Sequence, residues 1–269
     1  LGVIMLVDCH THIDQFTDEE ICQVLDRAKL AEVGAIVVAG TTIQSSHRAV
    51  TLSKEFPQIF AGVGIHPMDL QGPIGVTEYK ELDGLARFNE KVLVVSEIGL
   101  DFKEGTPDRA IQYQAFREQI RLARDLHLPI VFHSREAHDE TLRILKEEMA
   151  YDVGGIMHYF QADLRVAFRA IDLGFSISLA RPLFRLPKLQ VVVSKLPIEK
   201  LVIETDSAPQ PFKSKRQNWT EPRHTREIAE LISKIKSIPF EEVVDATTRN
   251  FFKVIGYKKC LVEKYARCI

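Results

Sequence analysis

The sequence predicts a single α/β domain, a closed (β/α)8 barrel with an extra C-terminal helix. Short apolar, β-branched runs alternate with longer helix-periodic segments along the chain, and eight such runs can be counted. The runs are apolar on both faces, which is typical of a parallel sheet covered by helices on both sides. Eight strand–helix units in 269 residues match the length of a TIM barrel.

The elements follow one another in a regular order. The predicted strands are Ile4–Cys9, Ala35–Ala39, Ile59–Gly64, Val92–Glu97, Pro129–His133, Gly155–His158, Phe175–Leu179 and Lys200–Glu204. Between and after them lie amphipathic segments such as Glu19–Ala31, Gln112–Leu126, Asp139–Glu148 and Glu227–Ile235. Phe240–Val254 is predicted as the further C-terminal helix.

No linker or low-complexity tract divides the chain, so residues 5–258 are expected to form one domain. We expect Met5 to be the native start and residues 1–4 to be an upstream remnant. The rival architecture is an open, doubly wound sheet, which usually has a Gly-rich phosphate loop after its first strand. The segment Asp8-Cys9-His10-Thr11-His12 occupies that place instead, which favours the barrel.

The composition limits the partners and the compartment. The net charge of −2, from 35 basic and 37 acidic residues, excludes binding of nucleic acid through a global positive field. The apolar run at the start is too short for a membrane anchor. The cysteines are scattered without a CxxC pair, which suits a reducing cytoplasm. The sequence has no long apolar stripe that would indicate a subunit interface, so a monomer with no membrane association is expected.

The chemically distinctive residues stand where apolar runs end. They are His10 and His12 after the first strand, His66 after the third, and Glu97, His133, His158 and Asp206 at or just beyond the fourth, fifth, sixth and eighth. In a closed barrel these strand ends meet at the carboxyl-terminal mouth, where active sites of such barrels lie. We therefore expect these side chains to converge.

Four imidazoles and two carboxylates form a mixed nitrogen and oxygen shell, which suits two divalent ions such as Mg²⁺, Mn²⁺ or Zn²⁺. Alternate residues of a strand point the same way, so His10 and His12 can hold one ion together. Glu97 can bridge two ions, and Asp206 can ligate one and take a proton from an activated water. Taken singly, an H-x-H pair can arise by chance, a carboxylate can cap a helix, and His133 can be a core histidine.

These residues carry a family resemblance. The segments Asp8–His12, Gly64–Pro67, Glu97–Asp101, His133–Arg135, His158–Phe160 and Glu204–Pro209 resemble the TatD family of metal-dependent deoxyribonucleases, in order and spacing from about Val7 to Gly256. The resemblance implies an amidohydrolase-type TIM barrel with His10 and His12 on a first metal, Glu97 as the bridge, His133 and His158 on a second metal, and Asp206 completing the site. His66 and Glu204 are expected to support the ligands or to contact phosphate.

Departures from the family pattern concern the substrate side. Leu100-Asp101-Phe102-Lys103 stands where relatives commonly have tyrosines, and the segment from Ala180 to Phe184 lacks an expected glycine. A late Asn-x-Pro-like segment appears as Asn218 to Pro222, with its asparagine displaced. The substrate is therefore less firmly predicted than the metal chemistry.

Basic residues follow the last two strands and indicate a positive rim around the mouth. Arginines and lysines position nucleic-acid strands through phosphates, and a tryptophan can stack a base. The expected rim comprises Arg135, Arg181, Arg216, Trp219 and Arg223. The alternative without a binding function is a solvated basic loop in which Trp219 covers an apolar patch.

Three functions from different classes remain. The leading one is a metal-dependent hydrolase of DNA phosphodiester bonds, a 3′–5′ exonuclease on single strands or strand ends. The second is a small-molecule amidohydrolase or lactonase with the same metal pair, although many of those use a carboxylated lysine where this chain has Glu97. The third is a barrel that only binds a partner, which the complete ligand set disfavours.

Overall fold

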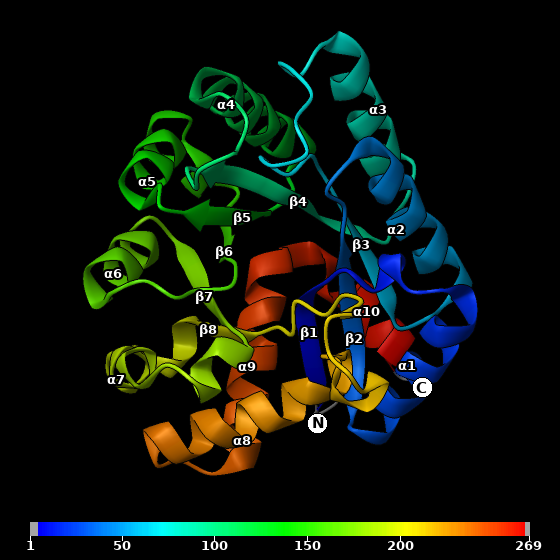
Figure 1. Cartoon of the computed structure of the whole chain (residues 1–269), viewed down its shortest axis with the longest axis vertical. Coiled ribbons are helices and arrows are strands. Elements are labelled where there is room, and N and C mark those ends of the chain that lie inside the picture. The colour runs from blue at the N-terminus through cyan, green and yellow to red at the C-terminus, as the bar shows by residue number, and fades with distance from the viewer. Residues whose placement is uncertain (1–4, 267–269) are drawn as a thin grey trace.

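The computed structural model describes residues 5–266, and the predicted remnant at residues 1–4 lies outside them. Eight parallel strands form one sheet in chain order and curl into a nearly closed barrel, which confirms the predicted fold (Figure 1). The strands are β1 (Leu6–Thr11), β2 (Val33–Ala39), β3 (Ile59–Val63), β4 (Val92–Asp101), β5 (Ile130–Arg135), β6 (Gly155–Met157), β7 (Phe175–Leu179) and β8 (Leu201–Ile203).

The first eight helices surround the barrel in the same order, and two more follow them in sequence (Figure 1). They are α1 (Asp18–Leu30), α2 (Ile43–Glu55), α3 (Val76–Arg87), α4 (Arg109–Leu126), α5 (His138–Glu147), α6 (Leu164–Asp172), α7 (Pro187–Lys195), α8 (Thr225–Lys236), α9 (Phe240–Ile255) and α10 (Lys259–Ala266). Among the described helices, none combines the length and the apolar character needed to cross a membrane.

Helix α1 shows how the sequence specifies one of these units. Thr17 caps its N-terminus by accepting the backbone N–H of Glu20, whose carboxylate accepts the N–H of Thr17 in return. This capping box satisfies two backbone donors that a helix start leaves free. The buried residues Ile21, Val24, Leu25 and Ala28 recur at helical spacing and face the barrel.

The seam between β8 and β1 closes next to the candidate site. The backbone N–H of Asp206 donates to His10 O (3.0 Å), and that of His12 donates to Ser207 O (2.9 Å). The buried carboxylate of Asp8 accepts the backbone N–H (2.8 Å) and the hydroxyl of Thr205. These bonds hold Asp206 beside His10 and His12, although the two segments are almost 200 residues apart in sequence.

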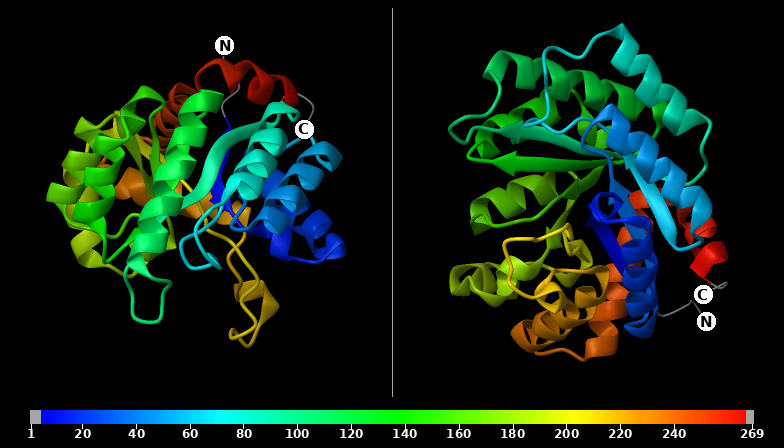
Figure 2. Two further views of the ribbon diagram at one scale, coloured as in Figure 1. Left: turned by 90° about the horizontal axis from the view of Figure 1, so that it is seen from above. Right: turned by 45° about the vertical axis from the view of Figure 1, so that its right-hand side comes forward.

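The end of the barrel opposite the mouth is closed by α9 and α10 (Figure 2). Phe251 and Val262 from these helices are buried against Val7 and Phe60 of the strands. The structure thus has two helices at the C-terminal end of its described part, where the sequence predicted one.

Strand boundaries differ from the prediction at the site. The first strand was expected to end at Cys9, but β1 continues to Thr11 and contains His10. We expected Glu97 to end the fourth strand, but β4 continues to Asp101, so Glu97 lies inside it. The pairing of β4 with β5 shifts register between Val95 and Ile98, and Glu97 stands in that irregular stretch. The prediction was wrong because polar Ser96 and Glu97 were taken as the end of an apolar run, whereas β4 is buried throughout.

Candidate metal centre

The candidate ligands meet at the floor of a cavity of about 510 Å³ at the barrel mouth. His12, Glu97, His133, His158 and Asp206 line it. His10 lies directly beneath, fully buried, with its Nε2 3.2 Å from Glu97 Oε2. The structure therefore brings together all six residues predicted as ligands.

Glu97 stands at the centre of the cluster and directs its two oxygens to different groups. Oε2 faces His10 (3.2 Å) and His12 (3.5 Å). Oε1 faces the nitrogens of His66 (3.3 Å), His133 (3.2 Å) and His158 (3.2 Å). One carboxylate thus separates two sets of imidazoles.

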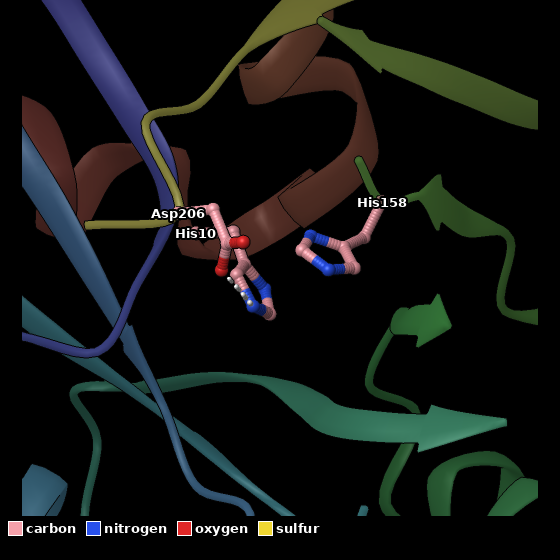
Figure 3. A group of neighbouring side chains, drawn as sticks. All are labelled: His10, His158 and Asp206. Carbon is pink, nitrogen blue, oxygen red and sulfur yellow. Dashed lines mark ion pairs between the residues drawn. The ribbon is translucent and has the colours of Figure 1, made fainter. Parts of the chain in front are cut away.

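The first set is completed by Asp206. His12 Nε2 lies 3.2 Å from Asp206 Oδ1 and 3.3 Å from His10 Nε2. In Figure 3, His10 and Asp206 lie together, and His158, which directly follows β6, faces them; the ring centroids of His10 and His158 are 3.9 Å apart. The Asp206 side chain keeps 26% of its surface exposed, so of the two carboxylates it is the one that can reach a molecule in the cavity.

The second set is held from behind by two further carboxylates. His133 uses Nδ1 toward Glu97, and its Nε2 lies 2.9 Å from Asp101 Oδ2. His158 uses Nε2 toward Glu97, and its Nδ1 forms a 2.9 Å ion pair with Glu204 Oε1. Carboxylates in this position fix the orientation of metal-binding imidazoles and raise their basicity.

The electrostatics of the cluster follow from burial opposed by close ion pairs. Burial would raise the pKa of Glu97, but the field of His158, His66 and His10 holds it well below its usual range. Burial would likewise lower the pKa of His12, but hydrogen bonds to Asp206 and Glu97 raise it to about 10. Asp206 remains ionised, with a pKa of about 2, because the hydrogen bond and the charge of His12 lower its pKa by more than burial raises it. Ionised carboxylates buried among imidazoles are the pattern expected where a cation belongs.

The donor set fits divalent metal ions. Metal–ligand bonds of about 2.0–2.2 Å put neighbouring donor atoms of one shell roughly 3–3.5 Å apart. The distances among His10, His12 and Glu97 are 3.2, 3.3 and 3.5 Å. Three groups have ligand atoms that all lie within 4.8 Å of one another, namely His10 with His12 and Glu97, His10 with His158 and Asp206, and His66 with Glu97 and His133.

His66 is in reach of the second set, but its hydrogen bonds suggest another role. The backbone N–H of Met68 donates to His66 Nδ1 at 3.1 Å. A neutral ring that accepts at Nδ1 carries its proton on Nε2, the nitrogen that faces Glu97. This favours His66 as a hydrogen-bond donor over a metal ligand and agrees with either role expected for it, support of Glu97 or contact with phosphate.

The predicted rim divides into residues at the cavity and residues away from it. Arg135 lines the cavity, and Asp101 holds its guanidinium at 3.0 Å and 2.6 Å. Arg216 instead pairs with Glu20 and Glu221, and Arg223 also contacts Glu221. Glu221 is almost fully buried, so these two cations serve an internal ion-pair cluster.

Trp219 and Arg181 are likewise engaged with the protein. The Trp219 ring is half-buried beside Phe16 (6.0 Å between centroids), with the Arg216 guanidinium 4.5 Å away. Arg181 pairs with Glu227 at 3.2 Å. Neither residue is among those lining the cavity, so the geometry resembles the packing alternative for Trp219 more than the stacking one.

Two residues of the site were not predicted from the sequence. Asp101 contacts both His133 and Arg135, and a signal existed, because it stands four residues after Glu97 in the same motif. Gly99 lies opposite His133 with a φ of +143°, and a Cβ there would come within 2.1 Å of His133 O. Only glycine permits this approach of β4 to β5, which brings His133 within reach of Glu97.

Comparison with known proteins identifies the family. The family model described as TatD related DNase matches residues 7–256, nearly the whole chain. The chain belongs to this TatD family. Among curated proteins, it is similar to the "Uncharacterized metal-dependent hydrolase YabD" of Bacillus subtilis, 37% identical over 257 residues that cover 91% of this chain and 97% of that protein.

Two further relatives connect this TatD-family chain with named deoxyribonucleases and with a solved structure. Human "Deoxyribonuclease TATDN3" is 31% identical over 96% of this chain and 97% of that protein. The crystal structure of YjjV, a TatD homologue from Escherichia coli K12, superposes with a TM-score of 0.85 at 27% identity, covering 93% of this chain and 97% of that one. The predicted enzyme class, a TatD-family metal-dependent hydrolase, is thereby confirmed.

Proposed function

We propose that this enzyme hydrolyses phosphodiester bonds of DNA and removes nucleotides from the 3′ end of single strands. The observation that carries the proposal is the division of the two Glu97 oxygens between two sets of imidazoles at the floor of one cavity. Such a division suits two cations held close together, an arrangement used for in-line displacement at phosphorus.

In this proposal two divalent ions, Mg²⁺, Mn²⁺ or Zn²⁺, occupy the centre. His10, His12 and Asp206 would hold one ion, His133 and His158 would hold the other, and Glu97, which faces both sets, would serve as a ligand to both. When bound, the ions supply positive charge to the phosphate and lower the pKa of a water molecule.

The side chains of the enzyme then have separate tasks. Asp206 reaches the cavity and is ionised, so it accepts the proton of the attacking water. Arg135 lines the cavity and is held by Asp101, so it can fix a phosphate in one orientation through its guanidinium. His66 donates from Nε2 to Glu97 or to a phosphate oxygen.

The DNA substrate and its end are supported by two further points. The family description and the human relative both name a deoxyribonuclease. The cavity of about 510 Å³ is in the range of sites for a single small ligand, which corresponds to roughly one nucleotide. A strand end fits such a closed floor, whereas the middle of a duplex does not.

The test is release of mononucleotides from a single-stranded oligonucleotide with Mg²⁺ or Mn²⁺ present, using strands labelled at either end. A 3′ label should leave as a mononucleotide at once, and a 5′ label should report a ladder of shortening strands. A panel of lactones and dipeptides runs in parallel. Hydrolysis of a panel compound without DNA cleavage would overturn the proposal in favour of a small-molecule hydrolase.

Chelation is the second arm of the test. Removal of the ions should abolish hydrolysis while the far-ultraviolet spectrum stays unchanged, because a barrel of this size folds on its own core. Restored cleavage after dialysis against Mg²⁺ or Mn²⁺ supports the proposal. Cleavage that persists in the chelated protein overturns it.

A further inference from the structure

A second group of side chains at the mouth, beyond the predicted rim, has exposed aromatic rings next to cations. Phe184 follows β7 in a short 3-10 turn and is 45% exposed, although Pro182 and Leu183 anchor that turn in the protein. Phe212 lies in the loop between β8 and α8 and is 81% exposed. That loop projects from the end of the barrel opposite α10 (Figure 2).

Each ring is followed in sequence by a basic residue. Arg185 is exposed, and the described residues include no ion-pair or hydrogen-bond partner for its side chain. Lys213 donates to the backbone oxygen of Asn218 at 3.0 Å. We call Phe184, Arg185, Phe212 and Lys213 the β7–β8 surface.

The cations of this surface are close to one another and to the cavity. Arg185 follows β7 and Lys213 follows β8, and these two strands are paired neighbours in the barrel, so both cations lie on adjacent loops that leave the mouth. Ala208, which stands a few residues before Phe212 and Lys213 in the same loop, lines the cavity. The positive surface therefore begins at the cavity wall and continues outward to Phe212.

We infer that single-stranded DNA leaves the cavity across the β7–β8 surface, with phosphates against Arg185 and Lys213 and a base stacked on Phe212. The inference rests on the proposed nuclease function and extends it to the path of the strand. Alternating cations and aromatic rings are how proteins bind single strands without sequence preference. Trp219 and Arg216 do not serve this path, because Trp219 packs beside Phe16 and Arg216 pairs with Glu20 and Glu221.

The experiment compares a thymidine dinucleotide with an oligothymidylate of about 15 nucleotides, a length in the range of single-strand sites. Phe212→Ala should raise KM for the long strand on the order of 10-fold, the typical effect of removing one stacked ring. The increase for the dinucleotide should be much smaller, because no more than one of its nucleotides extends beyond the cavity. Phe212→Trp should retain the affinity for the long strand, whereas Phe212→Leu should not.

The cations have their own readout. For Arg185→Ala and Lys213→Ala, the slope of log affinity against log salt, measured with a nuclease-resistant phosphorothioate strand, should fall by about 0.7 per lost phosphate contact. Phe88→Ala and Lys54→Ala are matched controls, since both residues are exposed and lie by the opposite end of the barrel. Melting temperatures verify that every variant is folded.

The outcomes separate the two proposals. If wild-type enzyme shortens the long strand but Phe212→Ala and Arg185→Ala behave like the controls, the strand path is overturned and the nuclease function stands. If wild-type enzyme releases no nucleotide from either substrate, the nuclease function itself fails. A KM increase that is equal for the dinucleotide and the long strand also overturns the path, because it would place Phe212 at the cavity instead.

Discussion

The mouth of the barrel and its opposite end bury different kinds of side chain on the same eight strands. At the mouth, His10, Glu97 and Glu204 are nearly inaccessible to solvent. At the opposite end, Val7, Phe60 and Phe251 fill the equivalent space with apolar atoms. Residues only three positions apart in one strand, such as Val7 and His10 in β1, therefore belong to different environments.

A charge buried at the opposite end, that of Lys91, shows what distinguishes the two regions. Lys91 donates its ammonium to the backbone oxygens of Ser53, Phe56 and Pro57, and it lies over the rings of Phe60 and Tyr265. Its hydrogen-bonding capacity is satisfied inside the protein. At the mouth, His10 Nδ1 and Glu204 Oε2 are buried without a hydrogen-bond partner. Buried polar groups that lack partners are a common sign of a functional site, whereas satisfied ones stabilise the fold.

If the end of the barrel opposite the mouth serves stability alone, a substitution there that strongly destabilises the fold should leave the hydrolytic activity intact. Phe251→Ala removes a fully buried ring and should lower the free energy of unfolding by about 3–5 kcal/mol. Denaturant unfolding measures this loss. Hydrolysis per folded molecule should stay within about twofold of wild type, since mutations distant from a site usually act independently.

The matched control for this prediction is Phe252→Ala. Phe252 lies next to Phe251 in α9 but is only partly buried, so its replacement should lower the free energy of unfolding by less. Equal losses for the two variants, or a large loss of turnover in folded Phe251→Ala, would show that the two ends are not separate.

At the mouth, the reverse is expected of Glu97→Gln. The amide keeps the size of the side chain but removes the charge that faces both sets of imidazoles. Turnover should fall on the order of 100-fold or more, as when a key transition-state stabiliser is removed, while the far-ultraviolet spectrum stays unchanged. Glu90→Gln, an exposed position just before β4, is the control. Near-normal turnover in Glu97→Gln would show that Glu97 does not bridge ions.

Asp101→Asn tests whether the mouth depends on residues behind the ligands. Asp101 contacts His133 Nε2 and the Arg135 guanidinium, so the amide should loosen both. We expect metal affinity to fall about 10- to 100-fold, measured by competition with a chromogenic chelator. Asp172→Asn, exposed at the end of α6, should leave the affinity unchanged. If Asp101→Asn does so too, His133 is oriented by other contacts.

The sequence predicted the barrel and the convergence of six ligands because both depend on local pattern. Valine- and isoleucine-rich runs specify buried strands, and a polar residue at the end of such a run must lie at the mouth. The pattern misplaced Glu97 at the end of its strand, because β4 buries polar residues as far as Asp101. Burial of a polar residue depends on partners from other strands, which local pattern does not reveal.

The rim was harder to predict for the same physical reason. Arg216 looked like a free cation in a basic segment, yet its partner Glu20 lies in α1, 196 residues away. Phe212 was not singled out, since nothing in its local sequence says that its ring remains 81% exposed while Trp219 packs beside Phe16. Exposure of a loop side chain is set by the tertiary contacts of the loop.

Release of a proton from His12 on metal binding is a further property expected of the mouth and not of the opposite end. In the metal-free protein, His12 is raised to a pKa of about 10 by Asp206 and Glu97 against its burial, so it is protonated at neutral pH. That proton stabilises the metal-free fold fully below the unfolded pKa of about 6.5, and the benefit is lost as pH rises through 10.

A metal ion must displace this proton, because one nitrogen cannot hold both. Metal affinity should therefore increase by up to about 10-fold per pH unit per proton released, between pH 7 and 10. Calorimetry at pH 8 in buffers of different ionisation enthalpy should give close to one proton per ion at the His12 set. Zero protons released would mean that His12 is not a ligand.

The smallest effect concerns Trp219, which lies in the loop after β8 near the mouth but has the contacts of a packing residue. Its ring is half-buried beside Phe16 and under Arg216, so Trp219→Ala should lower the free energy of unfolding by about 1–2 kcal/mol, less than for a fully buried ring. Per folded molecule, hydrolysis of bis-p-nitrophenyl phosphate and of single-stranded DNA should change equally and by less than about twofold, since the ring is not at the cavity. Melting temperature and both activities are measured on one preparation, beside Phe212→Ala. A loss of activity on DNA alone, with an unchanged melting temperature, would place Trp219 on the strand path. Residues that stabilise the fold and residues that contact the substrate would then both lie within the loop after β8.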